Sequence, residues 1–407
     1  MPRFEPFAGL RYDDDIAPAG EVIAPPYDIV DEAERAALAA RSPYNAIHVE
    51  LPEEEPGSGL DRYAHAAALF AVWQKEGALR RDDVPALYLY RMRFVDELGA
   101  HRSTLGVIGA LEMDVKNAGV VLPHERTMPK PKGDRLDLLR ATGINTSPIW
   151  GLSLAQGLAA ACGAAAEGHG GVAATDDEGV LHELIPIVDP AAISTITTLV
   201  GSTAVVIADG HHRYETAIFY REEERARDEG RDGPQDLVMA LIVELTPDEL
   251  VVQPIHRLIS GLARDVDLRA ALEPWFTLVP GPSEPAELIV AMRELGALGL
   301  VDQVGGVLLV PRPEVEAAAE ADLDSCRLDV ALANLPMHDL VYQHGAANAV
   351  RAVTQGRADA AVLLRAATVG QIADTAHSGK RMPPKTTFFY PKPRTGLVYR
   401  EARRTSD

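Results

Sequence analysis

The sequence predicts a mixed α/β or α+β protein, and three observations support this fold class. Short β-branched stretches such as Val205–Ile207 alternate along the chain with segments of helical periodicity such as Leu60–Lys75. Two apolar stretches, Ala86–Phe94 and Ser103–Leu111, flank a Leu98-Gly99 turn and are expected to pair as strands. The 407 residues, 47% of them hydrophobic, suffice for two or three domains with substantial cores.

The remaining elements follow from the same periodicity rules. Apolar residues at helical spacing predict helices over Glu32–Ala40, Leu60–Lys75 and Asp134–Thr142, and one that begins near Asp265. Alternating or continuous apolar runs predict strands over Asn45–Leu51, Val180–Val188, Leu237–Glu244, Gly306–Val310 and Ala360–Leu364.

A polar segment, Arg227–Asp236, contains two glycines and is typical of a connection between domains. It predicts an N-terminal α/β region over residues 1–230. A C-terminal α/β region over residues 237–407 is expected to return a basic Met-Pro-Pro-Lys-Thr-Thr loop, residues 382–387, to a shared cleft.

The composition limits which binding partners and which cellular location we expect. A formal net charge of −21 opposes non-specific binding to nucleic acid or to an anionic membrane, so neither is an expected partner. The two cysteines, Cys162 and Cys326, lie far apart without metal-type spacing, which suits a reducing interior. The charged N-terminus fits no signal peptide, and no apolar stretch has membrane-spanning length. We therefore expect a cytoplasmic protein. The composition leaves the oligomeric state open.

The most informative stretch is Asp209-Gly210-His211-His212-Arg213, which follows the strand predicted at Val205–Ile207. A glycine turn that leads from a strand into a helix points backbone N–H groups and the positive helix end at one place, where a phosphate can bind. The two histidines and the arginine add side-chain donors for an anion. Gly210, His212 and Arg213 are therefore candidate phosphate-binding residues.

Asp209 allows several roles at this turn. A carboxylate beside a phosphate site suits a Mg²⁺ ligand or a general base, whereas a purely structural aspartate would only cap the helix. A zinc site is not expected, because adjacent helical residues such as His211 and His212 point about 100° apart and no histidine follows four residues later.

A second cluster begins at Pro123 and ends near Arg135. It contains His124, Glu125, Arg126, Thr127, Lys130 and Lys132 in a loop with prolines and Gly133. Its cations suit a polyphosphate, and Glu125 could accept a hydroxyl proton or hold a metal, although a solvated surface loop would explain the same charges. We expect this loop to face the Asp209–Arg213 turn across a cleft.

Two further stretches carry residues of suitable chemistry. His256 and Arg257 form a pair after a predicted strand, where a structural role is the simpler explanation. Near the C-terminus, Lys385 and Thr386 lie in a segment over Gly379–Lys392 that combines cations, hydroxyls and aromatic residues, as in a pocket wall. No Walker A loop, GxGxxG fingerprint, GxSxG elbow or kinase HRD motif occurs.

Seven short motifs in order resemble a bacterial and archaeal family, the domain of unknown function 1015 family. They are Pro-Pro-Tyr-Asp at 25–28, Tyr-Asn-Ala-Ile-His at 44–48, Pro-His-Glu-Arg-Thr at 123–127, Asp-Arg-Leu at 134–136, Ser-Pro-Ile at 147–149, Ala-Asp-Gly-His-His-Arg-Tyr at 208–214 and Met-Pro-Pro-Lys at 382–385. The Asp-Gly-His-His-Arg segment is also similar to the phosphate-binding motif of the ParB/sulfiredoxin-like superfamily, which includes free-serine kinases.

This second resemblance implies a mixed-sheet core with a ParB/sulfiredoxin-like nucleotide-binding part and additional α/β segments. By analogy with the free-serine kinases, Asp209 would lie near the reacting hydroxyl, with His212 and Arg213 on the nucleotide phosphates. A glutamate elsewhere would act as base; we choose Glu125, which no motif fixes, and we include His211 in the catalytic group. The other residues expected to contact the phosphates, on their own chemistry, are Gly210, His124, Arg126, Thr127, Lys132, Arg135, His256, Arg257, Lys385 and Thr386. The sequence departs from the two resemblances at one point each. Where the domain of unknown function 1015 family often has Lys-Ser-Thr, this chain has Lys385-Thr386-Thr387. The chain also has no counterpart of the catalytic cysteine of sulfiredoxin, which excludes sulfinic-acid reduction.

Two functions are therefore expected as alternatives. The first is a phosphotransferase that uses Mg²⁺ and ATP or ADP to phosphorylate a small hydroxyl metabolite such as free serine, because phosphoryl transfer needs mainly positioning and charge neutralisation. The second is a regulatory protein related to ParB that binds or hydrolyses a nucleotide. The acidic net charge disfavours a DNA-bound form of the second.

Overall fold

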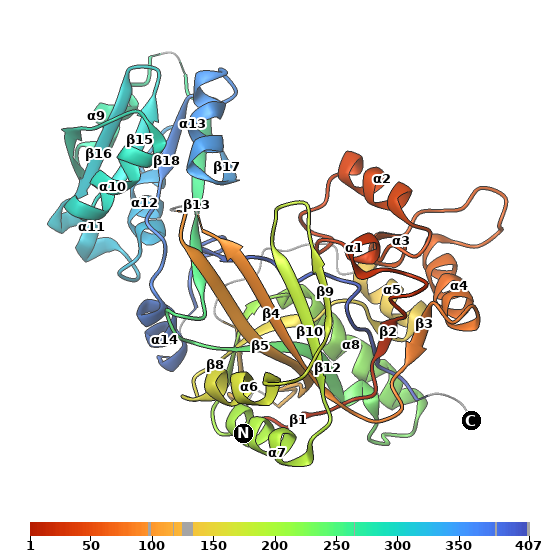
Figure 1. The fold of residues 1–407 in the computed structure, drawn as a ribbon. Helices are drawn as coiled ribbons and strands as arrows, with labels where there is room; N and C mark the ends of the chain where they lie inside the picture. The colour runs from red at the N-terminus through yellow and green to blue at the C-terminus, as the bar shows by residue number, and fades with distance from the viewer. Residues whose placement is uncertain (97–98, 117, 124–132, 264, 379–380, 405–407) are drawn as a thin grey trace. The chain divides into compact units, whose positions relative to one another are not determined.

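The computed structural model describes residues 1–96, 99–116, 118–123, 133–263, 265–378 and 381–404 (Figure 1). The chain forms two compact units. Unit 1 contains the described residues up to Pro123, those from 133 to Val251, and those from Pro391 onward. Unit 2 contains those from Val252 to Tyr390. The polar segment expected to separate domains, Arg227–Asp236, lies inside unit 1, so the units differ in their limits from the expected regions 1–230 and 237–407.

Unit 1 mixes helices and strands along its whole length. Its strands are β1 (Phe4–Glu5), β2 (Leu10–Tyr12), β3 (Leu79–Arg81), β4 (Leu87–Val95), β5 (His101–Glu112), β6 (Val121–Pro123), β7 (Ile144–Asn145), β8 (Ile149–Ser153), β9 (Val172–Thr175), β10 (Leu181–Ile187), β11 (Val205–Asp209), β12 (Leu237–Glu244) and β20 (Arg400–Glu401). Its helices are α1 (Ala19–Val22), α2 (Glu32–Arg41), α3 (Ile47–Glu50), α4 (Arg62–Lys75), α5 (Gly133–Thr142), α6 (Leu158–Ala166), α7 (Pro190–Gly201), α8 (His211–Arg227) and the 3₁₀ turn η1 (Pro234–Asp236).

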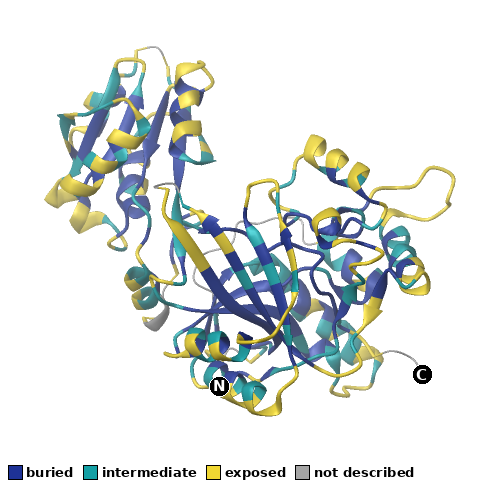
Figure 2. Cartoon of the chain, in the orientation of Figure 1, coloured by how far each residue is buried: buried dark blue, intermediate teal, exposed yellow. Residues whose placement is uncertain are grey.

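A nine-stranded mixed sheet forms the centre of unit 1. Its order is β6-β11-β8-β12-β5-β4-β10-β9, and β1 pairs with β5. The pairs β6–β11 and β8–β12 are parallel, and the others in this sheet are antiparallel. Figure 2 shows its strands largely buried while the helices keep exposed outer sides. The expected mixed α/β fold is therefore confirmed.

Two large cores and two smaller apolar clusters stabilise unit 1. One large core joins the sheet to α6, α7 and α8 through residues such as Cys162, Ile196 and Ala217. The other packs α2, α3, α4 and α5 around Trp73 and Tyr399, both buried. Aspartates at 31, 61 and 189 cap the N-termini of α2, α4 and α7, as their sequence positions favour.

The C-terminal segment Pro391–Arg400 is buried throughout and belongs to unit 1. Its backbone forms antiparallel β-bridges between Thr395 and Ala24 and between Tyr399 and Leu10. Arg400, in β20, is the strand partner of Asn145 in β7. Arg394 donates to Asp176, a buried carboxylate that His182 also contacts at 2.8 Å. This segment therefore completes unit 1 after the chain has passed through unit 2.

Unit 2 is built on a seven-stranded sheet of order β14-β16-β15-β18-β13-β17, with β19 paired to β13. Its apolar residues form two cores, one around Phe276 and Leu328 and one around Met292 and Ala349. Its elements are β13 (Val251–Ser260), α9 (Leu268–Leu272), β14 (Phe276–Pro280), α10 (Pro285–Leu295), β15 (Leu298–Asp302), β16 (Gly305–Pro311), α11 (Pro313–Ala318), α12 (Asp324–Leu332), β17 (Asp339–His344), α13 (Ala346–Thr354), β18 (Ala360–Leu363), α14 (Val369–His377) and β19 (Thr387–Tyr390).

The strand expected over Asn45–Leu51 is wrong, because this stretch contains the helical turn α3. The Asn45 side chain accepts from the N–H of Ile47 at 3.0 Å and donates to the carbonyl of Glu21 at 2.7 Å. Such local side-chain bonds favour a turn over an extended backbone.

Candidate functional site

The candidate site lies in unit 1, at the ends of two adjacent parallel strands. In β11 and β6, Val205 pairs with Val121 and Ile207 with Pro123, so both strands have their carboxyl ends at the same edge. Asp209 is the last residue of β11, and a bulge between Ile207 and Asp209 shifts its pairing with β8. Loops at the carboxyl ends of neighbouring parallel strands commonly form ligand sites.

Gly210 makes the sharp connection from β11 to α8. It has φ +84° and is the N-cap of α8, a 17-residue helix that begins at His211. The dihedral angle favours glycine here, and a Cβ atom at this position would lie 3.1 Å from Nε of Arg213, so a larger residue would also require Arg213 to shift. The strand, turn and helix agree with those expected from the sequence, and they direct the positive end of α8 at the site.

Asp209 forms ion pairs with two cations. Its Oδ2 accepts from Nη2 of Arg213 at 2.8 Å, and its Oδ1 accepts from Nζ of Lys392. The side chains of Asp209, Arg213 and Lys392 are 18%, 14% and 8% exposed. Burial alone would raise the pKa of Asp209, but Lys392 and Arg213 together hold the pKa well below its usual range. An ionised carboxylate with this pKa is a poor proton acceptor near neutral pH, which favours a positioning role over a general-base role.

Arg213 connects the turn to the segment before β8. Its Nη1 donates to the hydroxyl of Ser147 at 3.0 Å and to the carbonyl of Pro148 at 2.6 Å. Burial disfavours its charge, yet the nearby carboxylates raise its pKa, Asp209 first among them. With its three hydrogen bonds, to Ser147, Pro148 and Asp209, Arg213 organises the walls of the site as well as supplying charge.

A small pocket of about 40 Å³ lies beside Arg213 and is lined in part by Glu50, Arg135 and Ser147. The hydroxyl of Ser147 donates to Oε1 of Glu50 at 3.1 Å, and Nη1 of Arg135 donates to the carbonyl of Glu50 at 2.6 Å. Within the described part of the chain, the buried Oε2 of Glu50 has no hydrogen-bond partner. Buried carboxylate oxygens without partners are rare, so Glu50 is an additional candidate for proton transfer.

The Pro-Pro-Tyr-Asp motif also reaches this site. The guanidinium of Arg135 lies over the ring of Tyr27, 4.4 Å from its centroid. Burial raises the pKa of Tyr27, and the positive charges of Arg213 and Arg135 oppose that rise. Charges from Tyr27 and Asp28 in turn raise the pKa of Arg213, which places the motif near the turn.

The structure thus brings together Asp209, Gly210, Arg213 and Arg135 from the predicted set. His211 and His212 are the first two residues of α8 and are half-buried. The residues expected in the adjoining loop, His124, Glu125, Arg126, Thr127 and Lys132, lie outside the described residues. Pro123, which precedes that loop, pairs with β11. The facing arrangement across a cleft stays a prediction.

Four predicted phosphate-binding residues belong to unit 2. His256 and Arg257 were expected after a strand but lie within β13, both buried. Nδ1 of His256 accepts from the N–H of Leu364 at 3.2 Å, and Arg257 lies over the ring of Tyr342. Lys385 has φ +59°, and the Thr386 hydroxyl donates to the carbonyl of Pro383 at 2.8 Å. Their contact with a nucleotide stays a prediction.

Sequence reasoning did not select Lys392, Glu50, Ser147 or Tyr27 as site residues. Lys392 ends the cation-rich C-terminal segment, and Ser147 and Tyr27 lie in motifs of the family resemblance, so those motifs were the available signal. Glu50 follows the Tyr-Asn-Ala-Ile-His motif by two residues.

Mg²⁺ can bind at this site only if nucleotide phosphates supply part of its coordination. Among the described residues, no group of three or more His, Cys, Asp or Glu side chains is arranged to hold a metal. Both oxygens of Asp209 accept from cations. Mg²⁺ commonly keeps several waters and binds through one or two carboxylates plus substrate phosphates, so the phosphates would have to supply part of its coordination here.

Comparison with known proteins identifies a family whose model matches most of the chain. The family model described as "Protein of unknown function (DUF1015)" matches residues 4–331. No curated protein matches the sequence. None of the helices in the described ranges is both long and apolar enough to cross a membrane.

Several solved structures resemble the chain at low identity. A conserved hypothetical protein from Pyrococcus furiosus has a TM-score of 0.37 and 14% identity, covering 69% of this chain and 90% of its own. A free serine kinase in complex with AMP has a TM-score of 0.36 and 15% identity, covering 66% and 83%. SbnI with a C-terminal truncation from Staphylococcus aureus has a TM-score of 0.38 and 11% identity, covering 72% and 86%.

Proposed function

The chain belongs to the DUF1015 family of proteins of unknown function, and we propose that it is a nucleotide-dependent phosphotransferase that acts on a small hydroxyl-bearing metabolite. The observation that carries this proposal is the buried Lys392–Asp209–Arg213 cluster at the Gly210 turn into α8. It combines a positive helix end with an ammonium and a guanidinium group, the groups that bind nucleotide phosphates.

Each residue has a defined part in this reaction. Lys392 binds and neutralises the transferring phosphate, while Asp209 fixes the position of Lys392 and Arg213 fixes the turn. Arg135, beside Tyr27, adds a second guanidinium near the site. Mg²⁺, held through the nucleotide phosphates, would supply further charge neutralisation. Preorganised cations of this kind act mainly by stabilising the charge of the transition state.

The transfer itself needs one proton acceptor. The oxygen of the acceptor hydroxyl attacks the terminal phosphorus of ATP or ADP, the bond from that phosphorus to its bridging oxygen breaks, and the nucleotide leaves one phosphate shorter. The hydroxyl proton passes to a carboxylate. Glu125 is the base chosen from the sequence, a choice that no motif fixes. Glu50, whose buried Oε2 has no hydrogen-bond partner among the described residues, is the second candidate.

The alternative function is a nucleotide-responsive regulatory protein. The same cluster could hold nucleotide phosphates without an acceptor site, and water would then be the only nucleophile. A single incubation distinguishes the two functions. The full chain is incubated with Mg²⁺, ATP or ADP, and a mixture of hydroxyl metabolites that includes free serine, and products are identified by mass spectrometry.

A phosphorylated metabolite supports the phosphotransferase. Nucleotide binding without any such product supports the regulatory protein, and absence of nucleotide binding overturns both. Lys392→Met should lower turnover by about 100-fold, the usual effect of removing one preorganised charge donor. Lys75→Met is the matched control, because Lys75 is an exposed lysine on α4 of the same unit. Equal activity of both variants would remove Lys392 from the mechanism.

A further inference from the structure

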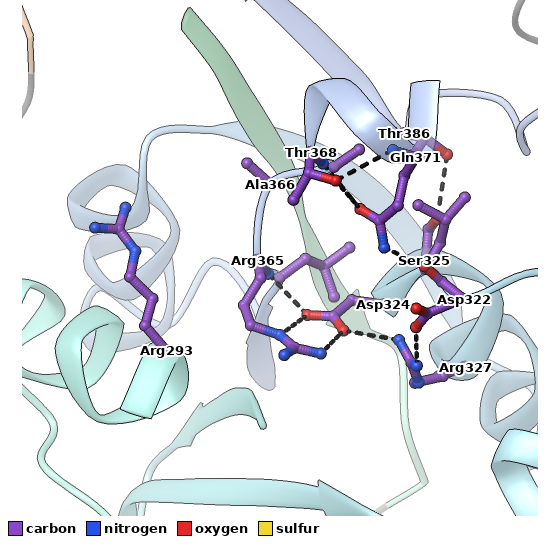
Figure 3. Close-up of a pocket in the computed structure, with 13 residues that line it drawn as sticks. Arg293, Asp322, Asp324, Ser325, Arg327, Arg365, Ala366, Thr368, Gln371 and Thr386 are labelled. Atoms are coloured by element: carbon purple, nitrogen blue, oxygen red, sulfur yellow. Dashed lines mark hydrogen bonds and ion pairs between the residues drawn. The ribbon is translucent and has the colours of Figure 1, made fainter. Parts of the chain in front are cut away.

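Unit 2 contains a cavity of its own with a volume of about 380 Å³. It is enclosed by the start of α12, the segment Leu364–Gln371 after β18, Thr386, and Arg293 of α10 (Figure 3). This size lies within the range of small-ligand sites. Of the residues in its wall, Thr386 alone was expected from the sequence to contact the nucleotide, and none has a part in the phosphotransfer proposed above.

The arginines that line this cavity differ in the number of carboxylates that pair with them. The buried carboxylate of Asp324 accepts from Nε and Nη2 of Arg365 at 2.9 and 2.5 Å and from Nη1 of Arg327 at 3.3 Å. Arg327 also pairs with Glu316 at 3.0 Å and with Asp322, so its charge is compensated. Among the residues that the structure describes, the guanidinium of Arg365 pairs only with the carboxylate of Asp324, which it shares with Arg327.

Two groups remain available to a ligand. In the described part of the chain, Nη1 of Arg365 and the exposed guanidinium of Arg293 have no hydrogen-bond or ion-pair partner. Nη1 of Arg365 lies 3.6 Å from the position of a Cβ atom on Gly296, the residue that ends the helix of Arg293. Figure 3 shows Arg293 apart from the Arg365–Asp324 pair, with its guanidinium directed away from that pair.

The neutral polar side chains of the wall bond mainly to one another. The Thr368 hydroxyl donates to the Gln371 side chain at 3.1 Å, and Gln371 donates to the carbonyl of Asp322. The hydroxyls of Ser325 and Thr386 lie 3.2 Å apart. Besides the exposed carboxylate of Asp322, which pairs with Arg327, the side-chain groups left for a ligand are the N–H donors of Arg365 and Arg293. Such donors match a ligand group that only accepts and is negative.

We propose that this cavity is a binding site for a small metabolite with oxyanion groups, phosphate or carboxylate, for which Arg365 and Arg293 supply cationic donors from different parts of the wall. Asp324 is a positioning residue that orients the fork of Arg365 without contacting the ligand. Arg forks match the geometry of both oxyanions. The site lies entirely within unit 2 and does not depend on the proposed phosphotransfer.

Titration calorimetry on the full chain at constant ionic strength tests the proposal, with inorganic phosphate and malonate as separate probes. We expect at least one of them to bind, and the stronger of the two identifies the oxyanion. Arg293→Met should weaken that binding about tenfold or more, the effect of losing one charge-assisted hydrogen bond. Because Arg293 is exposed and has no partner among the described residues, this variant should keep its fold.

Arg312→Met is the matched control, since Arg312 is an exposed arginine of unit 2 outside the cavity and its loss changes the net charge equally. Binding that weakens equally in both variants would reflect net charge alone and overturn the site. Failure of both probes to bind would also overturn it. Arg365→Met should abolish binding at this site. Phosphate binding that is lost in Lys392→Met but kept in Arg365→Met would belong to the nucleotide site of unit 1, and if all binding behaved so, the site in unit 2 would be overturned.

Discussion

At the scale of single residues, Asp209 links the chemistry of the site to its stability. One carboxylate accepts from Lys392 and Arg213, which come from segments far apart in the chain, and all three side chains are largely buried. The two cations are stable there because Asp209 compensates their charge. Its removal should therefore affect folding as well as catalysis.

We predict that Asp209→Asn destabilises the protein by about 3–5 kcal/mol, the usual cost of leaving a buried charge unpaired. This differs from the near-normal stability expected if Asp209 only capped α8 or acted as a base. Urea unfolding measures the change. The double variant Asp209→Asn/Lys392→Met should recover part of that stability while remaining inactive. A double variant no more stable than the single one would show that the ion pair is not the cause.

The free energy of unfolding of unit 2 should depend on pH through the titration of His256. Burial lowers the pKa of His256 to about 4, and the charge of Arg257 contributes. The unfolded chain has the ordinary value near 6.5, so between pH 6.5 and 4 the unfolded state binds a proton that the folded state does not. Stability should thus fall by about 3 kcal/mol as the pH drops through this window.

The measurement compares unfolding free energies of the natural protein and His256→Gln from pH 7 to pH 4. Glutamine can still accept from the N–H of Leu364 but does not titrate. Because other histidines titrate in both proteins, the difference between the two curves isolates His256. Parallel curves would contradict the prediction.

Sequence patterns identified Asp209, Gly210 and Arg213 because these residues are neighbours in one short motif. They did not identify Lys392, whose bond to Asp209 spans 183 residues. They also missed Glu50, which meets Ser147 across 97 residues. Such partners arise from tertiary structure, and a single sequence carries no direct record of them.

At the scale of elements, the step from β11 to α8 was predictable and the turn before α3 was not. A β-branched run, a glycine and helical spacing all favour the same structure at residues 205–227. At residues 45–51, apolar alternation favours a strand while the side chain of Asn45 favours a turn, and the turn prevails. Local signals conflict there, so pattern alone misleads.

We predict that Gly210→Ala is more damaging than Gly157→Ala. Both glycines are N-caps with nearly equal φ, +84° and +88°, but a Cβ atom at Gly157 meets nothing within 4 Å. Gly157→Ala should cost about 1–2 kcal/mol from the left-handed backbone alone. Gly210→Ala should cost more and also weaken nucleotide binding, since Arg213 must move. Thermal unfolding and nucleotide titration of the two variants measure this, and equal losses would mean that Arg213 adjusts freely.

At the scale of the whole molecule, unit 2 is inserted between two parts of unit 1. The polar segment 227–236 suggested a boundary because of its composition, but Asp236 is tied back to Arg221 and Arg225 in α8. The real transitions, near Val251 and Tyr390, fall at or within strands that no glycine-rich linker marks. Composition therefore predicted two regions but could not predict an insertion.

We predict that a chain ending at Tyr390 lacks a stable unit 1, while residues 252–390 fold alone. The missing segment removes the buried Tyr399 from its core and leaves Asp176 and Asp209 without Arg394 and Lys392. Unit 2, in contrast, keeps its whole sheet and both cores. Circular dichroism and urea unfolding of the two fragments test this. A truncated chain in which unit 1 unfolds cooperatively at the natural midpoint would contradict it.

The insertion also sets an order of events during translation. Ribosomes add about 5–20 residues per second, so the roughly 140 residues of unit 2 separate Val251 from Pro391 by about 7–30 s. During that interval unit 2 can fold, whereas unit 1 must wait with an unfilled core that a chaperone could recognise. Because Lys392 follows unit 2 in the chain, a nascent chain that has only reached unit 2 has no lysine beside Asp209. If the proposed function holds, such a chain cannot yet bind the nucleotide phosphate through this lysine.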